Sequence, residues 1–279
     1  MEIRPGKRVD ITVTELNFEY LDDVLLAASR KGIDVGSYFK DAVVTRIGPL
    51  AELLIQNRTQ SGGFDVLPAN AVATALRRAL DRRAPVSGSH VSAEQGRFTA
   101  GFMTTRRDPQ AVDESHWMSF CLRAQQAAES VGVHKSTARG LIGALREIES
   151  NVHEHSGRAH DGIVGYRATE SDFEFVVADS GVGTLAALRR NPKYADLADP
   201  GRALELALTD GVSSFGDDSG RGYGFRDLFI GLANLSGELR FRSGDHALTI
   251  DGTGPSLPSR RLIQKPQLQG FVASIVCHL

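Results

Sequence analysis

The sequence predicts an α+β fold in which helices pack on a mixed, mainly antiparallel sheet. Segments with helical and with strand-like periodicity are intermixed along the chain. Two alternating segments, 161–168 and 172–179, are separated only by the polar residues Thr-Glu-Ser, which is the pattern of a β-hairpin. Because a hairpin pairs its strands antiparallel, this pattern favours helices on one sheet over a parallel doubly wound architecture.

The composition is that of a globular protein with a sizeable core. The chain has 279 residues, of which 41% are hydrophobic and 24% charged. A net charge of −2 gives no general reason to expect nucleic acid or an acidic membrane as a partner. The N-terminus lacks the apolar run of a secretion signal, and the two cysteines, Cys121 and Cys277, offer no framework of disulfides. We therefore expect a cytoplasmic protein with no membrane partner.

The first third of the chain is predicted to be a smaller α/β domain, residues 1–95, that senses a signal or binds a partner protein. A short alternating run indicates a strand at 9–13, and helical patterns follow at 19–32, 41–58 and 69–83. Residues 84–96 are rich in small and turn-forming residues, and we interpret them as a linker.

The second predicted domain, residues 96–279, has the sharper pattern. It begins with a strand at 97–104 and two helices at 116–133 and 135–156. The hairpin follows, and then helices at 201–211 and 225–237. Further strands are expected near 238–243, 247–251 and 271–277.

The helix at 135–156 carries polar residues at a regular spacing beside its apolar stripe. Glu147, Asn151 and His155 are four residues apart, so they lie on a single flank and rise by about 6 Å each. A carboxylate beside a carboxamide suits phosphate chemistry with Mg²⁺, which prefers oxygen ligands. A polar surface with incidental spacing is the alternative interpretation of this segment.

A second group of residues follows the strand at 172–179. Asp179 ends the strand, and Gly181 and Gly183 allow the backbone to turn and to approach a flat ring. A rigidly held carboxylate can accept a hydrogen bond from the amine of adenine, whereas guanine presents a carbonyl at that position. An unpaired buried acceptor costs about 1–3 kcal/mol, and this cost would select the base.

A third group precedes the helix at 225–237. Gly220, Gly222 and Gly224 alternate with Arg221 and Tyr223. Glycines leave backbone N–H groups free to meet phosphate, and the start of a helix adds its positive end. Taken alone, each glycine group is also typical of ordinary turns.

The three groups occur in the order E-x3-N-x3-H, D-x-G-x-G, G-x-G-x-G, and this order resembles the GHKL superfamily of Bergerat-fold ATP-binding domains. The resemblance extends from about residue 97 to the end of the chain. The superfamily includes histidine kinases, anti-sigma-factor serine kinases, DNA gyrase, mismatch-repair ATPases and the ninety-kilodalton heat-shock chaperones. The motifs look closest to bacterial anti-sigma-like and histidine-kinase-like ATPase domains.

The resemblance implies ATP and Mg²⁺ as cofactors. It implies that Asn151 is the Mg²⁺ ligand, that Glu147 is the catalytic acidic residue and that Asp179 reads adenine. Residues 184–219 correspond to the ATP lid. The other nucleotide-binding residues implied are His155, Gly181, Gly183, Gly220, Arg221, Gly222, Tyr223 and Gly224.

Several functions stay open at this point. The chain lacks the phosphoacceptor histidine block of sensor kinases and has Gly270-Phe271 where anti-sigma kinases tend to have Gly-Thr. One hypothesis is a bacterial signalling ATPase or a serine/histidine protein kinase-like phosphotransferase. The second is a nucleotide-gated switch with little or no catalysis that binds a protein partner through residues 1–95, and either could be a homodimer. A third is a metal-dependent hydrolase that uses His153, His155 and His160.

Overall fold

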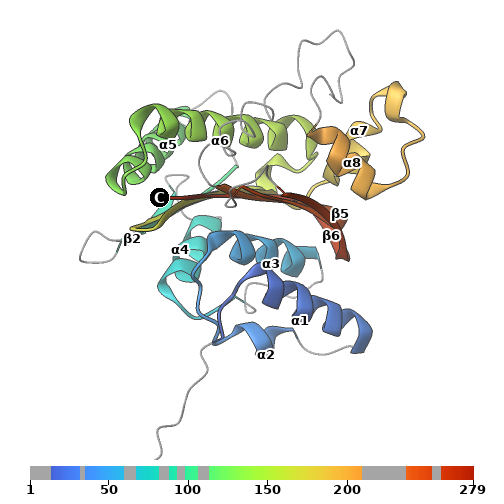
Figure 1. The fold of residues 1–279 in the computed structure, drawn as a ribbon, viewed down its shortest axis with the longest axis horizontal. Coiled ribbons are helices and arrows are strands. Elements are labelled where there is room, and N and C mark those ends of the chain that lie inside the picture. Colours follow the sequence, from blue (N-terminus) through green and yellow to red (C-terminus); the bar gives the residue numbers. More distant parts are fainter. Residues whose placement is uncertain are drawn as a thin grey trace, which may run out of the picture.

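A curved sheet lies between two layers of helices (Figure 1). The computed structural model describes residues 14–31, 35–59, 67–81, 88–92, 98–105, 113–208, 237–252 and 259–279. The helices are α1 (Phe18–Lys31), α2 (Gly36–Phe39), α3 (Ile47–Thr59), α4 (Ala71–Leu80), α5 (Asp113–Ser130), α6 (Lys135–His155), α7 (Gly183–Leu188) and α8 (Pro200–Ala207). The strands are β1 (Ser89–Ser92), β2 (Phe98–Thr104), β3 (Ile163–Thr169), β4 (Asp172–Asp179), β5 (Gly237–Asp251) and β6 (Ser259–His278).

The six strands have the order β1-β2-β3-β4-β6-β5, and neighbouring strands pair antiparallel throughout. The predicted hairpin is confirmed, because β3 and β4 pair with Ile163 opposite Ala178. The C-terminal strand β6 then pairs with β4, which places Phe271 opposite Asp179. The α+β class is therefore confirmed, and the end of β4 lies inside the sheet rather than at its edge.

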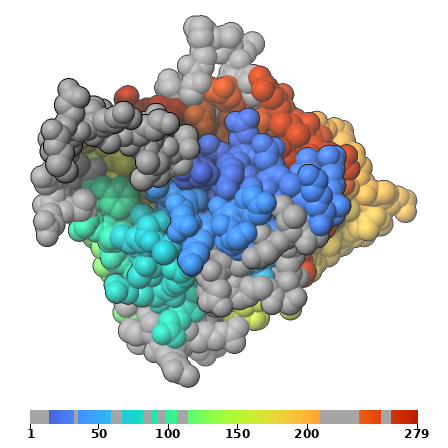
Figure 2. Space-filling model, turned by 90° about the horizontal axis from the view of Figure 1, so that it is seen from below, coloured from blue at the N-terminus to red at the C-terminus, as the bar shows by residue number. Residues whose placement is uncertain are grey.

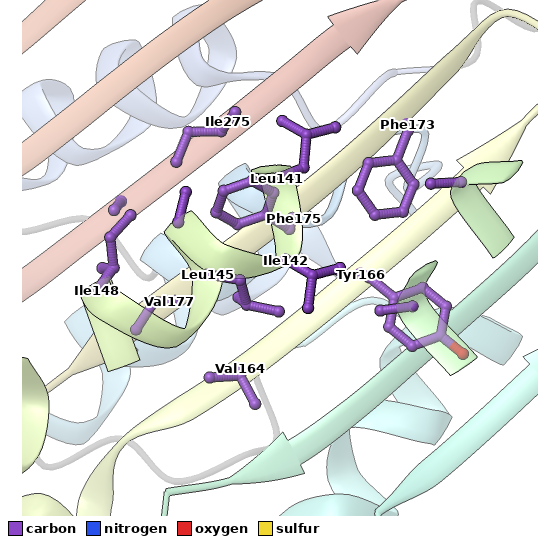
Figure 3. Close-up of a cluster of buried hydrophobic side chains, with 14 of the residues drawn as sticks. Leu141, Ile142, Leu145, Ile148, Val164, Tyr166, Phe173, Phe175, Val177 and Ile275 are labelled. Atoms are coloured by element: carbon purple, nitrogen blue, oxygen red, sulfur yellow. The ribbon is translucent and has the colours of Figure 1, made fainter. Parts of the chain in front are cut away.

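One face of the sheet is covered by α5 and α6. The predicted apolar stripe of α6 is confirmed, since Leu141, Leu145, Ile148 and Val152 are all nearly or fully buried. Figure 3 shows three of these residues beside side chains of β3, β4 and β6, and all belong to one hydrophobic cluster. This cluster holds α6 in a defined orientation, and so it determines which flank of the helix remains polar.

The opposite face of the sheet is covered by the N-terminal helices α1, α3 and α4 (Figure 1). Figure 2, viewed from this side, shows that N-terminal residues occupy much of this face of the molecule, with C-terminal residues visible beside them. Their apolar side chains share one cluster with sheet residues, among them Phe102, Ile163, Val176 and Val272. Among the described residues, the layer before the predicted boundary at residue 95 therefore has no core separate from the sheet.

Two features of the N-terminal part differ from the sequence predictions. Residues 89–92 of the predicted linker form strand β1, which pairs with β2, because pairing in the sheet overrides their turn-like composition. The helix predicted at 41–58 begins only at Ile47. Val43 instead exchanges backbone hydrogen bonds with Thr14 and Leu16, which keeps this segment extended. The strand predicted at 9–13 and the helix predicted at 225–237 lie outside the described residues, apart from Gly237, which opens β5.

Buried charges attach the N-terminal layer to the sheet. The carboxylate of Glu174 on β4 is fully buried and accepts hydrogen bonds from the backbone N–H groups of Ile47 and Gly48, at 2.9 and 2.7 Å. These are the first residues of α3, where N–H groups have no partner within the helix. Glu52 of α3 bonds Arg240 and Arg242 of β5 at 3.0 and 3.2 Å. The position of α3 on the sheet is thus specified by polar contacts as well as by apolar packing.

The C-terminal strands contain one sharp bend. The strands predicted at 238–243 and 247–251 are two halves of β5, which has irregular pairing between Ser243 and His246. The Gly252 N–H donates to the Gly237 carbonyl at 2.9 Å, so the two ends of β5 lie together. Arg242 supports the bend by donating to the carbonyl groups of Gly244 and His246.

Candidate functional site

The polar flank of α6 has the arrangement that its spacing predicts. Glu147 is exposed, whereas Asn151 and His155 are partly buried. The imidazole of His155 is 22% exposed, and its Nε2 lies 4.0 Å from Oε2 of Glu154. The three residues thus form a row that runs from solvent at Glu147 toward the end of the helix, where Ser156 contacts the turn that follows β4.

Asp179 ends β4 and is almost completely buried, with 4% exposure. Burial raises the pKa of its carboxyl to about 6, although a hydrogen bond from the Gly181 N–H to Oδ1, at 2.7 Å, acts in the opposite direction. No described residue donates a hydrogen bond to Oδ2. The strand therefore holds an acceptor in a desolvated position with capacity for a further donor.

The turn after Asp179 packs directly on the end of α6. Ser156 is the first residue after α6, and a side chain at position 181 would overlap its carbonyl group. Only glycine therefore fits at position 181. The same carbonyl accepts a hydrogen bond from the Val182 N–H at 2.9 Å. Gly183 then adopts a φ of +77°, which glycine adopts without strain. The structure thus brings two of the three predicted motifs together.

The third predicted motif, Gly220, Arg221, Gly222, Tyr223 and Gly224, lies outside the described residues. The segment predicted to be the lid, residues 184–219, is described as far as residue 208. This part packs against the sheet, since Leu204 of α8 is buried in the same cluster as Leu248 of β5. The part of the predicted lid that contains α8 is therefore packed against the sheet.

The three histidines of the metal hypothesis have separate surroundings. His153 lies on the opposite flank of α6 from His155, and its Nε2 is 2.9 Å from the buried carboxylate of Glu149. His160 is mostly exposed and lies 3.5 Å from Asp161. Within the described part of the chain, no group of three or more His, Cys, Asp or Glu side chains could hold a metal ion.

Two serines of this region were not identified from the sequence. Ser156 supplies the carbonyl against which Gly181 packs. Ser243 of β5 accepts a hydrogen bond from the Thr184 N–H, which follows the turn. Their contribution depends on contacts between distant segments, and no spacing in the sequence indicates it.

No model of a known protein family matches the chain, and no curated protein matches it. In the described parts of the chain there is also no helix with the length and apolar character needed to cross a membrane.

Proposed function

We propose that this chain is an ATP-binding protein of the GHKL type that acts as an ATPase or as a protein kinase-like component of bacterial signalling. The proposal rests on one observation. A buried carboxylate with acceptor capacity, Asp179, ends a central strand directly beside the helix that carries Glu147, Asn151 and His155.

The residues around Asp179 fit the adenine base. The ionised carboxylate would accept a hydrogen bond from the exocyclic amine. The absence of a side chain at Gly181 lets the turn pack on the Ser156 carbonyl at the end of α6. Guanine presents a carbonyl oxygen at this position, so it would donate no hydrogen bond to the Asp179 carboxylate. The two negatively polarised groups would also repel each other. The site therefore supports selection of adenine over guanine.

The polar flank of α6 fits the other end of the nucleotide. Asn151 offers a neutral oxygen to Mg²⁺, which usually keeps several of its waters. Bound ATP with Mg²⁺ would supply a transferable phosphate. Glu147 is exposed, so its carboxylate can accept a proton from water or from a hydroxyl group.

A nucleotide-gated switch is the second candidate, and the attachment of α7 and α8 favours it. The turn that follows Asp179 continues without interruption into α7, and α8 packs on the sheet beside it. A ligand that contacts the turn would therefore also bias the position of α7. Such a switch needs no hydrolysis to change a surface offered to a partner protein.

Ligand-induced stabilisation tests nucleotide binding. ATP with Mg²⁺ at a hundredfold excess over its Kd should stabilise the protein by about 2.7 kcal/mol, and GTP should stabilise it much less. The variant Asp179→Asn should lose this effect because its amide can place a donor against the adenine amine. Asp196→Asn, an exposed change in the same half of the chain, serves as the control. Equal stabilisation by ATP in parent and Asp179→Asn would overturn the adenine assignment.

Turnover distinguishes the two candidates. Release of phosphate that Glu147→Ala abolishes, with ATP affinity retained, would support catalysis. Binding of ATP without turnover in the parent protein would support the switch. Incubation with γ-labelled ATP would show whether label passes to water, to this protein or to a partner.

A further inference from the structure

Ser243 lies close to the predicted base-binding turn although it is 64 residues beyond Asp179 in the sequence. It belongs to β5, where it pairs with Phe271 of β6, and Phe271 pairs in turn with Asp179 of β4. The three residues therefore form one row across neighbouring strands. The Ser243 side chain is buried, with 3% exposure.

The hydroxyl of Ser243 makes two hydrogen bonds that connect different elements. It donates to the Gly270 carbonyl of β6 at 2.7 Å. It also accepts from the N–H of Thr184, the second residue of α7, at 3.0 Å. The single hydroxyl therefore links the beginning of α7 to the strand that lies beside Asp179.

These contacts complete the attachment of the turn. Its beginning is held by β4, and its middle by the bond from the Val182 N–H to the Ser156 carbonyl. Its end, directly after Gly183, is held by Ser243. Gly183 lies between these last two hydrogen bonds and adopts a positive φ, a backbone conformation that residues other than glycine rarely adopt.

We propose that Ser243 is a positioning residue of the nucleotide site, which sets the geometry of the Asp179–Gly183 turn through the backbone of Thr184. This inference rests on the proposed ATP-binding function. Ser243 acts on the ligand only through the turn, so its removal should weaken binding while the maximal turnover of bound ATP stays as in the parent.

The test compares Ser243→Ala with Ser274→Ala. Ser274 is an equally buried serine of β6, and its hydroxyl lies 3.5 Å from Glu174, on the face of the N-terminal layer. Both variants lose a buried hydroxyl, but only the first loses a contact to the turn. Calorimetric titration with ADP and with a slowly hydrolysed ATP analogue should show about tenfold weaker binding of both ligands to Ser243→Ala. The affinity of Ser274→Ala should equal that of the parent.

A second measurement requires no nucleotide. Hydrogen exchange at the Thr184 amide should be faster in Ser243→Ala than in the parent, and unchanged in Ser274→Ala. If Ser243→Ala does not fold, Ser243→Cys keeps most of the volume and replaces the hydroxyl by a weak donor and acceptor. It should then show the same losses.

The outcomes separate this inference from the proposed function. If the parent binds nucleotide and Ser243→Ala binds it with unchanged affinity, the positioning role is wrong. An equal loss of affinity in both alanine variants would also overturn it, because the effect would then be general. If the parent binds no adenine nucleotide, the proposed function falls, and the exchange measurement still decides whether Ser243 holds the turn.

Discussion

Two buried carboxylates of strand β4, Glu174 and Asp179, lie on opposite faces of the sheet because they are an odd number of positions apart in the strand. Glu174 faces the N-terminal layer and accepts two backbone hydrogen bonds from α3, with Arg167 3.7 Å away. Asp179 faces the side of α6 and accepts one bond from a described residue, the N–H of Gly181. Burial raises the pKa of both carboxyl groups.

The comparison shows that burial alone does not identify a functional carboxylate. Glu174 has both oxygens occupied by donors from the same protein, so it holds a helix in place. Asp179 is nearly as buried but keeps an oxygen that no described residue uses. This difference is the reason why the proposed nucleotide site is placed at Asp179 and not at Glu174.

Removal of the N-terminal layer should have the largest effect. Deletion of residues 1–95 would expose sheet residues such as Phe102, Ile163, Val176 and Val272 and would leave Arg240 and Arg242 without Glu52. Burial of one such apolar side chain contributes about 1.5–3 kcal/mol, and the whole stability of a domain is about 5–15 kcal/mol. We expect the remaining fragment to be unfolded or aggregated by circular dichroism and gel filtration. A monomeric, cooperatively folded fragment would instead support an independent domain at 96–279.

Glu174→Ala should come next. The substitution leaves the first N–H groups of α3 without an acceptor and removes a negative charge near the buried guanidinium of Arg167. We expect the free energy of unfolding to fall by about 3–5 kcal/mol. The matched control is Glu170→Ala in the exposed turn of the same hairpin, where the change should stay within about 0.5 kcal/mol. Urea denaturation measures both. Similar losses in the two variants would mean that the contact between Glu174 and α3 contributes little.

Asp179→Asn should have a smaller effect with the opposite sign. The folded state binds the Asp179 proton more tightly than the unfolded state does, since the pKa rises from 3.8 to about 6. The contribution of this carboxyl to the free energy of unfolding is therefore most favourable at low pH, and this contribution decreases as the pH rises from about 4 to about 6. The uncharged variant should be more stable than the parent at pH 7, by at most about 2–3 kcal/mol.

The pH dependence makes this prediction specific. The stability difference between Asp179→Asn and the parent should be small near pH 4 and should grow to a plateau above about pH 6. Denaturation in urea at several pH values provides the measurement. A difference that does not vary with pH would show that Asp179 titrates normally.

Much of the local structure could be predicted from the sequence because it depends on residues close together in the chain. The apolar stripe of α6 and the β3–β4 hairpin follow from periodicity and a three-residue turn. The extended conformation at Val43 and the strand inside 84–96 could not be predicted, because pairing with other segments produces them. The packing of the N-terminal helices on the second face of the sheet was missed for the same reason.

The candidate site divides in the same way. Glu147, Asn151, Asp179 and its glycines were predicted from residue type and spacing, and the structure brings the end of α6 together with the Asp179 turn. Ser243 could not be predicted, since its hydrogen bond to Thr184 joins residues 59 positions apart.

By itself, the sequence determined the helical and strand periods and the chemical groups that each element presents, since these depend on neighbours within a few residues. Only the tertiary structure decided that Glu174 has both oxygens bonded by donors of the protein, whereas Asp179 has an oxygen that no described residue uses. The reason is that the donors that distinguish Glu174 from Asp179 come from another layer of the fold, more than a hundred residues away in the chain.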